Sequence, residues 1–82
     1  MNRAPILERL DEAERLVADS ECLIARQKSI MRRLLMDDLD AEPARVRLFQ
    51  FEKMHALHVA ERDRLRAALV QAFTVPSDGR PG

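Results

Sequence analysis

Two long stretches with the residue spacing of a helix, separated by one short acidic break, constrain this chain more than any other feature. In the first stretch the core-type positions step by four and three: Ile6, Leu10, Ala13, Val17, Ser20, Ile24, Gln27, Met31 and Leu34. In the second they are Ala44, Leu48, Phe51, His55, His58, Arg62, Leu65, Leu69 and Phe73. This spacing places the side chains on one helix face, and a break of about six residues favours antiparallel neighbours. We therefore predict an all-α antiparallel two-helix hairpin.

Helix boundary signals divide the chain in the same way. Pro5 suits the first turn of a helix, where its missing N–H is not needed. Asp40 can cap a second helix that carries Pro43 in its first turn. We expect helices over about 5–36 and 43–73, within one helical hairpin of residues 1–75. Residues 76–82, which contain two prolines and two glycines, are predicted to form a flexible tail.

Composition limits the classes of function. Lysine plus arginine number 14, as do aspartate plus glutamate, so no net charge attracts a polyanion. No stretch approaches the ~20 apolar residues of a membrane span. The single cysteine, Cys22, cannot form an intramolecular disulfide, which fits a reducing compartment. We expect a soluble, cytoplasmic protein that does not contact the membrane.

The apolar surface is wider than one contact between two helices can cover. Some apolar residues form a second file at seven-residue spacing beside the seam of the first helix, and others point away from the seam of the second helix. These predicted interface residues are Leu16, Leu23, Ile30, Val46, Phe49 and Leu57. Because each helix of a hairpin has one neighbour, we expect the chain to form a homodimer, a four-helix bundle.

Polar side chains occupy core-type positions in both helices. If the chain folds back about residue 41, Arg62 lies level with Ser20, and His55 lies level with Gln27. The sequence therefore predicts a polar layer across the middle of the bundle, comprising Ser20, Gln27, His58 and Arg62.

Two contacts are expected within this polar layer. Arg62 should pair with Asp19 or Glu21, and His58 should donate a hydrogen bond to a neighbour. Such a layer costs stability but penalises other helix registers. The alternatives are that the histidines simply reach water at the edge of the seam, or that they bind a ligand.

Glu52 and His55 form a Glu-x-x-His step, the unit that di-iron helical bundles combine with an extra carboxylate from each partner helix. His58, one turn further on, is a third candidate ligand. The first helix offers no acid at this level, because Glu21 lies about nine residues away, or ~13 Å along the axis. We therefore expect no metal and no cofactor, and keep a metal- or small-ligand-binding bundle as an alternative.

Catalysis is not expected. The sequence has no glycine-rich phosphate loop and no serine beside a base–acid pair, and acidic neighbours disfavour a Cys22 thiolate. Basic residues near the break are interleaved with acids, and the chain has no tyrosine or tryptophan to stack on bases. A nucleic-acid accessory protein is the weaker alternative.

Two segments carry a resemblance to a known group of proteins. The first is Ile24-Ala25-Arg26-Gln27, before the acidic break, and the second covers 56–65, Ala-Leu-His-Val-Ala-Glu-Arg-Asp-Arg-Leu. Over about 6–70 the chain resembles small helical-hairpin proteins common in alphaproteobacteria. The resemblance implies a bacterial cytosol and marks His58 and Arg62 as characteristic, but it implies no activity. Those proteins carry glycine near position 38 and threonine near 41, where this chain has Asp38 and Ala41.

These observations predict a non-enzymatic, self-associating helical interaction module that docks on a protein partner. Val46, Phe49 and Leu57 are the candidates for the dimer or partner surface, because exposed apolar patches mark contacts. Replacing Phe49 with aspartate should then produce monomers or abolish capture of the partner.

Overall fold

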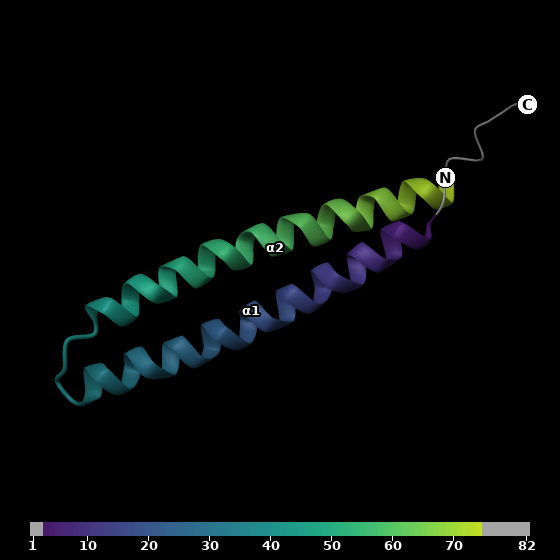
Figure 1. Cartoon of the computed structure of the whole chain (residues 1–82). Coiled ribbons are helices and arrows are strands. Elements are labelled where there is room, and N and C mark those ends of the chain that lie inside the picture. Colours follow the sequence, from purple (N-terminus) through teal and green to yellow (C-terminus); the bar gives the residue numbers. More distant parts are fainter. Residues whose placement is uncertain (1–2, 75–82) are drawn as a thin grey trace, which may run out of the picture.

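The chain forms two helices of equal length that lie side by side in opposite directions (Figure 1). The computed structural model describes residues 3–74, where α1 spans Ala4–Met36 and α2 spans Glu42–Thr74. Each helix has 33 residues and is therefore about 50 Å long. The predicted all-α antiparallel hairpin is confirmed, and the helix bounds differ from the predicted ranges by at most one residue. The tail predicted at 76–82 lies outside the described residues.

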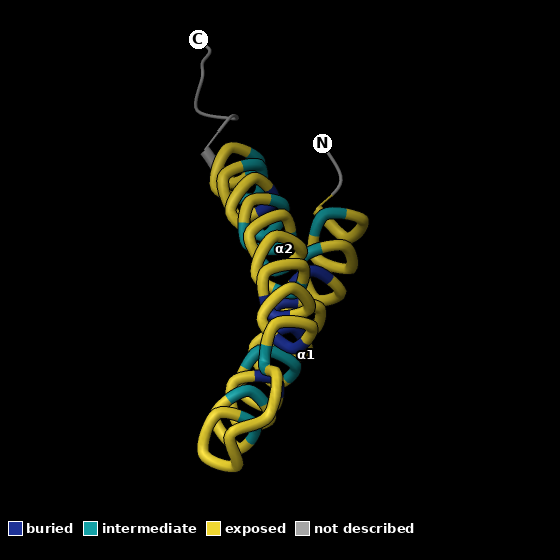
Figure 2. The backbone as a smooth tube through the Cα atoms, turned by 90° about the vertical axis from the view of Figure 1, so that its left-hand side faces the viewer, coloured by how far each residue is buried: buried dark blue, intermediate teal, exposed yellow. Residues whose placement is uncertain are grey.

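The two helices wind about each other. In Figure 1 they are separated near the turn and converge toward the other end, whereas in the perpendicular view of Figure 2 they overlap near the turn and separate at the other end. The direction from one helix to the other therefore rotates along the hairpin, as a repeat of seven residues produces.

A left-handed residue ends α1. Asp38 has φ of +59°, the N–H of Leu39 donates to the Leu34 carbonyl at 2.8 Å, and the N–H of Asp38 donates to the Leu35 carbonyl at 3.2 Å. This pair of bonds is the Schellman motif, whose left-handed position is usually a glycine because glycine has no Cβ to clash. Here Asp38 occupies that position.

The start of α2 follows the sequence-based prediction. Asp40 Oδ1 accepts a hydrogen bond from the N–H of Glu42 at 3.0 Å, and Pro43 lies in the first turn. The Arg45 guanidinium bonds the Glu42 carboxylate one turn later. The predicted cap by Asp40 is confirmed.

Only a narrow seam between the helices is buried, as the dark blue segments of Figure 2 show. Its apolar members are Ala13, Val17, Ala44, Leu48 and Leu65, and its polar members are Ser20 and Gln27. Several of these side chains are small, so they allow the helices close approach but hide little apolar area. No large side chain of the described part of the chain is completely buried.

The predicted seam is wrong at one position near the end of α2. Phe73 is 57% exposed, and half-buried Ala72 takes the seam position instead. Ala72 follows Leu65 by seven residues, two helical turns, whereas Phe73 lies one residue further round the helix. The guanidinium of Arg3 lies 4.4 Å from the centre of the Phe73 ring.

Candidate interaction surface

A strip of apolar side chains runs along one flank of the hairpin. From α1 it contains Leu16, half-buried Leu23 and Ile30, which is 44% exposed, and from α2 it contains Met54, which is 45% exposed. The three residues of α1 are spaced by seven, so they lie nearly above one another. We call these four residues the lateral strip. Within the hairpin it remains open to solvent.

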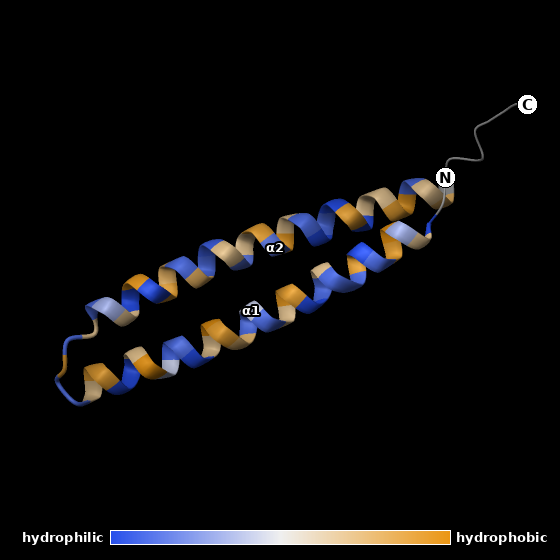
Figure 3. Cartoon of the chain, viewed as in Figure 1, coloured by the Kyte–Doolittle hydropathy of each residue, from blue (hydrophilic) through white to orange (hydrophobic). Residues whose placement is uncertain are grey.

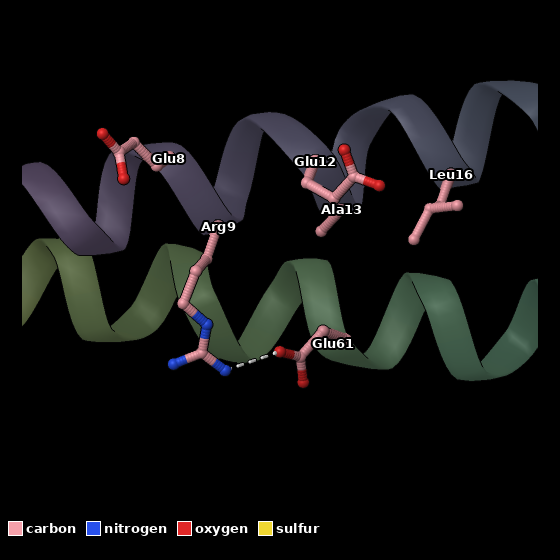
Figure 4. A pocket seen from close by; sticks show the side chains of 6 residues that line it. All are labelled: Glu8, Arg9, Glu12, Ala13, Leu16 and Glu61. Atoms are coloured by element: carbon pink, nitrogen blue, oxygen red, sulfur yellow. Dashed lines mark hydrogen bonds and ion pairs between the residues drawn. The ribbon is translucent and has the colours of Figure 1, made fainter.

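A shallow groove marks the end of the lateral strip nearer the start of α1. It has a volume of about 300 Å³ and is lined by Glu8, Arg9, Glu12, Ala13, Leu16 and Glu61. Figure 4 shows Arg9 of α1 reaching across to Glu61 of α2, with Leu16 from the same helix as Arg9 further along the groove. The Arg9–Glu61 ion pair measures 3.3 Å. This groove has acids from α1 on its rim.

A second shallow groove, of about 320 Å³, marks the other end of the lateral strip. It is lined by Arg26, Ser29, Ile30, Arg33 and Leu34. Its rim is basic, and Arg26 and Arg33 are both exposed. The lateral strip therefore has acidic groups of α1 beside Leu16 and basic groups of α1 beside Ile30.

The middle of the opposite flank of the hairpin is charged. There Arg66 of α2 bonds Glu14 of α1 at 3.1 Å. Glu21 and Lys28 follow Glu14 at seven-residue spacing, and all three are exposed. The same file has Leu7 and Leu35 at its two ends, which are 49% and 60% exposed. The uninterrupted apolar file of α1 is therefore the one formed by Leu16, Leu23 and Ile30.

The six predicted interface residues do not form a single surface. Leu16, Leu23 and Ile30 lie on the flank, but the three residues from α2 lie on the side of that helix turned away from its seam. These residues, Val46, Phe49 and Leu57, are all exposed, and Leu57 is 70% exposed. The Nζ of Lys53 lies 5.5 Å from the centre of the Phe49 ring. We call these three residues the outer patch.

Met54 is the member of the lateral strip that sequence reasoning missed. Its signal was present in the heptad pattern, because Met54 precedes Glu61 by seven residues and so occupies the same flank of α2. The pattern alone does not say which file of α2 adjoins Leu16. The groove that contains both Leu16 and Glu61 supplies that information.

Figure 3 shows hydrophobic segments recurring along the whole length of both helices, among hydrophilic ones. In α1 the apolar residues concentrate on one side, whereas in α2 they are spread more evenly around the axis. Neither helix contains, within residues 3–74, a segment apolar and long enough to cross a membrane.

Ser20 and His55 form the first polar contact inside the seam. Ser20 Oγ lies 2.9 Å from the Val17 carbonyl oxygen, to which it donates, and 2.7 Å from His55 Nδ1. A hydroxyl has one proton, so an oxygen that donates to Val17 must accept from His55. In this arrangement His55 carries a proton on Nδ1. Ser20 is buried and His55 is half-buried.

Gln27 forms the second polar contact. Its Nε2 donates to the Ala44 carbonyl oxygen at 3.0 Å, and both residues are buried. The amide thereby ties the second half of α1 to the first turns of α2.

The predicted register was wrong by about one heptad. We expected His55 level with Gln27, but His55 meets Ser20, which lies seven residues or about 10 Å closer to the start of α1. The turn explains part of the difference, because α1 ends at Met36 and α2 begins at Glu42, so the chain reverses before residue 41.

The two contacts predicted for Arg62 and His58 are not formed in this register. Arg62 pairs with neither Asp19 nor Glu21, and its guanidinium instead bonds Asp63 of the same helix at 3.1 Å. His58 is half-buried and makes no side-chain hydrogen bond within residues 3–74, so the expected donation is absent there. The polar groups inside the seam are Ser20 and Gln27, which are buried, and His55, which is half-buried.

Metal-ligating side chains do not converge. Within the described helices and turn, no three His, Cys, Asp or Glu side chains lie close enough to share an ion. Glu52 is exposed, and the Nδ1 of His55 is occupied by Ser20. Cys22 is exposed and forms no disulfide within residues 3–74.

Arginine contacts perturb two carboxyl groups. The hydrogen bond from Arg64, helped by attraction to Arg64 and Arg9, holds the pKa of Glu61 below its ordinary value of 4.5. The hydrogen bond from Arg45 likewise lowers the pKa of Glu42. All of these groups are at the surface, where such pairs contribute little individually.

No protein-family model, curated protein or solved structure matches the chain.

Proposed function

We propose that this chain is a non-enzymatic, self-associating helical interaction module. Two hairpins pair into a four-helix bundle, and the outer patch of α2 docks on a protein partner. The resemblance to small alphaproteobacterial hairpin proteins is consistent with a bacterial cytosolic setting. The observation that carries the proposal is the lateral strip, an apolar file left open beside a thin seam.

Energetics support a second chain over the lateral strip. Fully burying a leucine or isoleucine side chain is worth about 1.5–3 kcal/mol relative to leaving it in water. The seam itself hides five apolar residues, two of which are alanines. Leu16, Ile30 and Met54 are 37%, 44% and 45% exposed, so association would add the part of this stabilisation that the hairpin leaves unused.

Sedimentation velocity of matched lysine variants tests the self-association. Ile30→Lys introduces a charge into the lateral strip and should shift the native dimer to monomers. Val46→Lys makes the same kind of change on the outer patch, where Val46 is 43% exposed against 44% for Ile30, and should leave the dimer intact. Circular dichroism checks that both variants stay helical. If both variants stay helical and weaken the dimer equally, the lateral strip is not the dimer contact.

The outer patch is proposed as the docking surface for the partner protein. Phe49→Asp should abolish capture of the partner by the tagged chain while leaving the dimer intact, because Phe49 lies off the lateral strip. Ala25→Asp adds the same charge at an exposed position of α1 that belongs to neither apolar surface, and it serves as the control. Loss of the dimer in Phe49→Asp would assign the outer patch to self-association instead.

A further inference from the structure

We infer that two copies pair through the lateral strip about a two-fold axis that passes between them at the level of Leu23, perpendicular to the helices. The two turns then lie at opposite ends of the bundle, with α1 against α1 and α2 against α2. This inference rests on the proposed self-association and specifies its surface and its orientation.

The apolar residues of α1 are self-complementary in this arrangement. Leu16 and Ile30 lie seven residues before and after Leu23. An axis at Leu23 therefore places each Leu23 against Leu23 of the second copy, and each Leu16 against Ile30 of the second copy. Three consecutive layers of aliphatic side chains form along the α1 contact.

The charges beside these layers are complementary in the same arrangement. The axis brings the groove of Leu16, with Glu12 on its rim, against the groove of Ile30, with Arg33 on its rim. Asp19 and Arg26 lie between these positions in the same file, and both are exposed. Glu12 thus faces Arg33 of the second copy, and Asp19 faces Arg26. Each contact occurs twice because the interface is isologous.

The residues of α2 fit the same axis. Glu61 lines the groove of Leu16, so Met54, seven residues nearer the turn, lies level with Leu23, and Arg47 lies level with Ile30. The axis places Met54 against Met54 of the second copy and Glu61 against Arg47. Arg47 is exposed and has no ion pair within residues 3–74, so it is available for this contact.

An axis parallel to the helices gives a poorer match. With the turns at the same end and α1 against α2, Leu16 would face Glu61 of the second copy and Ile30 would face Arg47. With α1 against α1 in parallel, Glu12 would face Glu12 and Arg33 would face Arg33. Charges against apolar or like-charged groups cost free energy, so the antiparallel pairing of α1 is favoured.

Disulfide cross-linking tests the axis directly. In a Cys22→Ser chain, Leu23→Cys should cross-link to the same position of the second copy under mild oxidation. Leu16→Cys and Ile30→Cys should each fail to cross-link alone and should cross-link when mixed. If the Cys22→Ser chain sediments as a dimer but position 23 and the mixed pair do not cross-link, the axis is wrong and self-association stands. If the Cys22→Ser chain and the native chain are both monomeric, the proposed self-association and the proposed axis are both wrong.

Charge exchange gives a second test that leaves the apolar residues intact. The variant Glu12→Arg with Asp19→Arg, and the variant Arg26→Glu with Arg33→Glu, each carry like charges along this file. Each alone should dimerise at least about tenfold more weakly than the native chain, and an equal mixture should recover dimers. Recovery in the mixture supports the antiparallel contact. A mixture that stays as weak as its components overturns it.

Discussion

At the scale of single residues, the end of α1 depends on a residue in a costly backbone conformation. Asp38 adopts φ of +59° so that the N–H groups of Asp38 and Leu39 can reach the last carbonyls of the helix. For a residue with a Cβ this region costs about 1–2 kcal/mol, which glycine avoids.

Asp38→Gly should therefore raise the free energy of unfolding by about 1 kcal/mol, reduced somewhat by the greater freedom of glycine in the unfolded chain. Urea unfolding at fixed chain concentration measures the change. Asp37→Gly is the matched control, because Asp37 has φ of −92° and gains nothing from glycine. The explanation fails if Asp37→Gly stabilises the chain as much as Asp38→Gly.

Glu61 makes stability depend on acid pH. Its folded pKa lies below the ordinary 4.5, mainly because Arg64 donates to its carboxylate. Its contribution is therefore present above about pH 4.5 and is lost as the pH falls through the folded pKa. The native chain should lose more stability than Glu61→Gln between about pH 5 and about pH 3.

Thermal unfolding at several pH values measures this difference. Glu8→Gln is the control, because Glu8 makes no ion pair within residues 3–74. A native chain and a Glu61→Gln chain with parallel pH profiles would show that the Arg64 and Arg9 contacts do not persist in solution.

At the scale of the helices, the boundaries were predictable because they depend on local chemistry. Pro5 and Pro43 fit only first turns, and the Asp40 side chain bonds the N–H of Glu42 as a capping residue should. The left-handed conformation of Asp38 was not predictable in this way, since aspartate is compatible with several turn conformations.

The register between the helices was not predictable from the pattern of apolar residues. If α1 slides along α2 by seven residues, the same face of α1 still contacts α2. The apolar pattern of the seam is therefore compatible with either register. Specific polar contacts distinguish the registers: His55 meets Ser20, and Gln27 reaches the Ala44 carbonyl. This agrees with a role for buried polar groups in fixing the register.

The Ser20–His55 contact should show energetic coupling. Ser20→Ala removes the partner of His55 Nδ1 and should cost about 1 kcal/mol, whereas Ser29→Ala, at an exposed site of the same helix, should be neutral or slightly stabilising. Ser20→Ala with His55→Leu should cost less than the sum of the single changes, by about 0.5–1 kcal/mol. Strict additivity in urea unfolding would argue against the hydrogen bond.

At the scale of the whole molecule, the sequence predicted that apolar surface would remain uncovered but did not predict its distribution. The seven-residue spacing within α1 is enough to place Leu16, Leu23 and Ile30 in one row along that helix. Assigning Met54 to the same flank requires knowing how α2 lies against α1. The same knowledge separates the outer patch from the lateral strip, which the sequence had placed together.

The proposed assembly requires a second copy to cover the lateral strip. Sedimentation velocity of the native chain, from about 1 to about 100 μM, measures this most directly, because association shifts with concentration by mass action. We expect a helical species of twice the 9.4 kDa chain mass at the upper concentrations. A folded, helical species of 9.4 kDa across the whole range would contradict it.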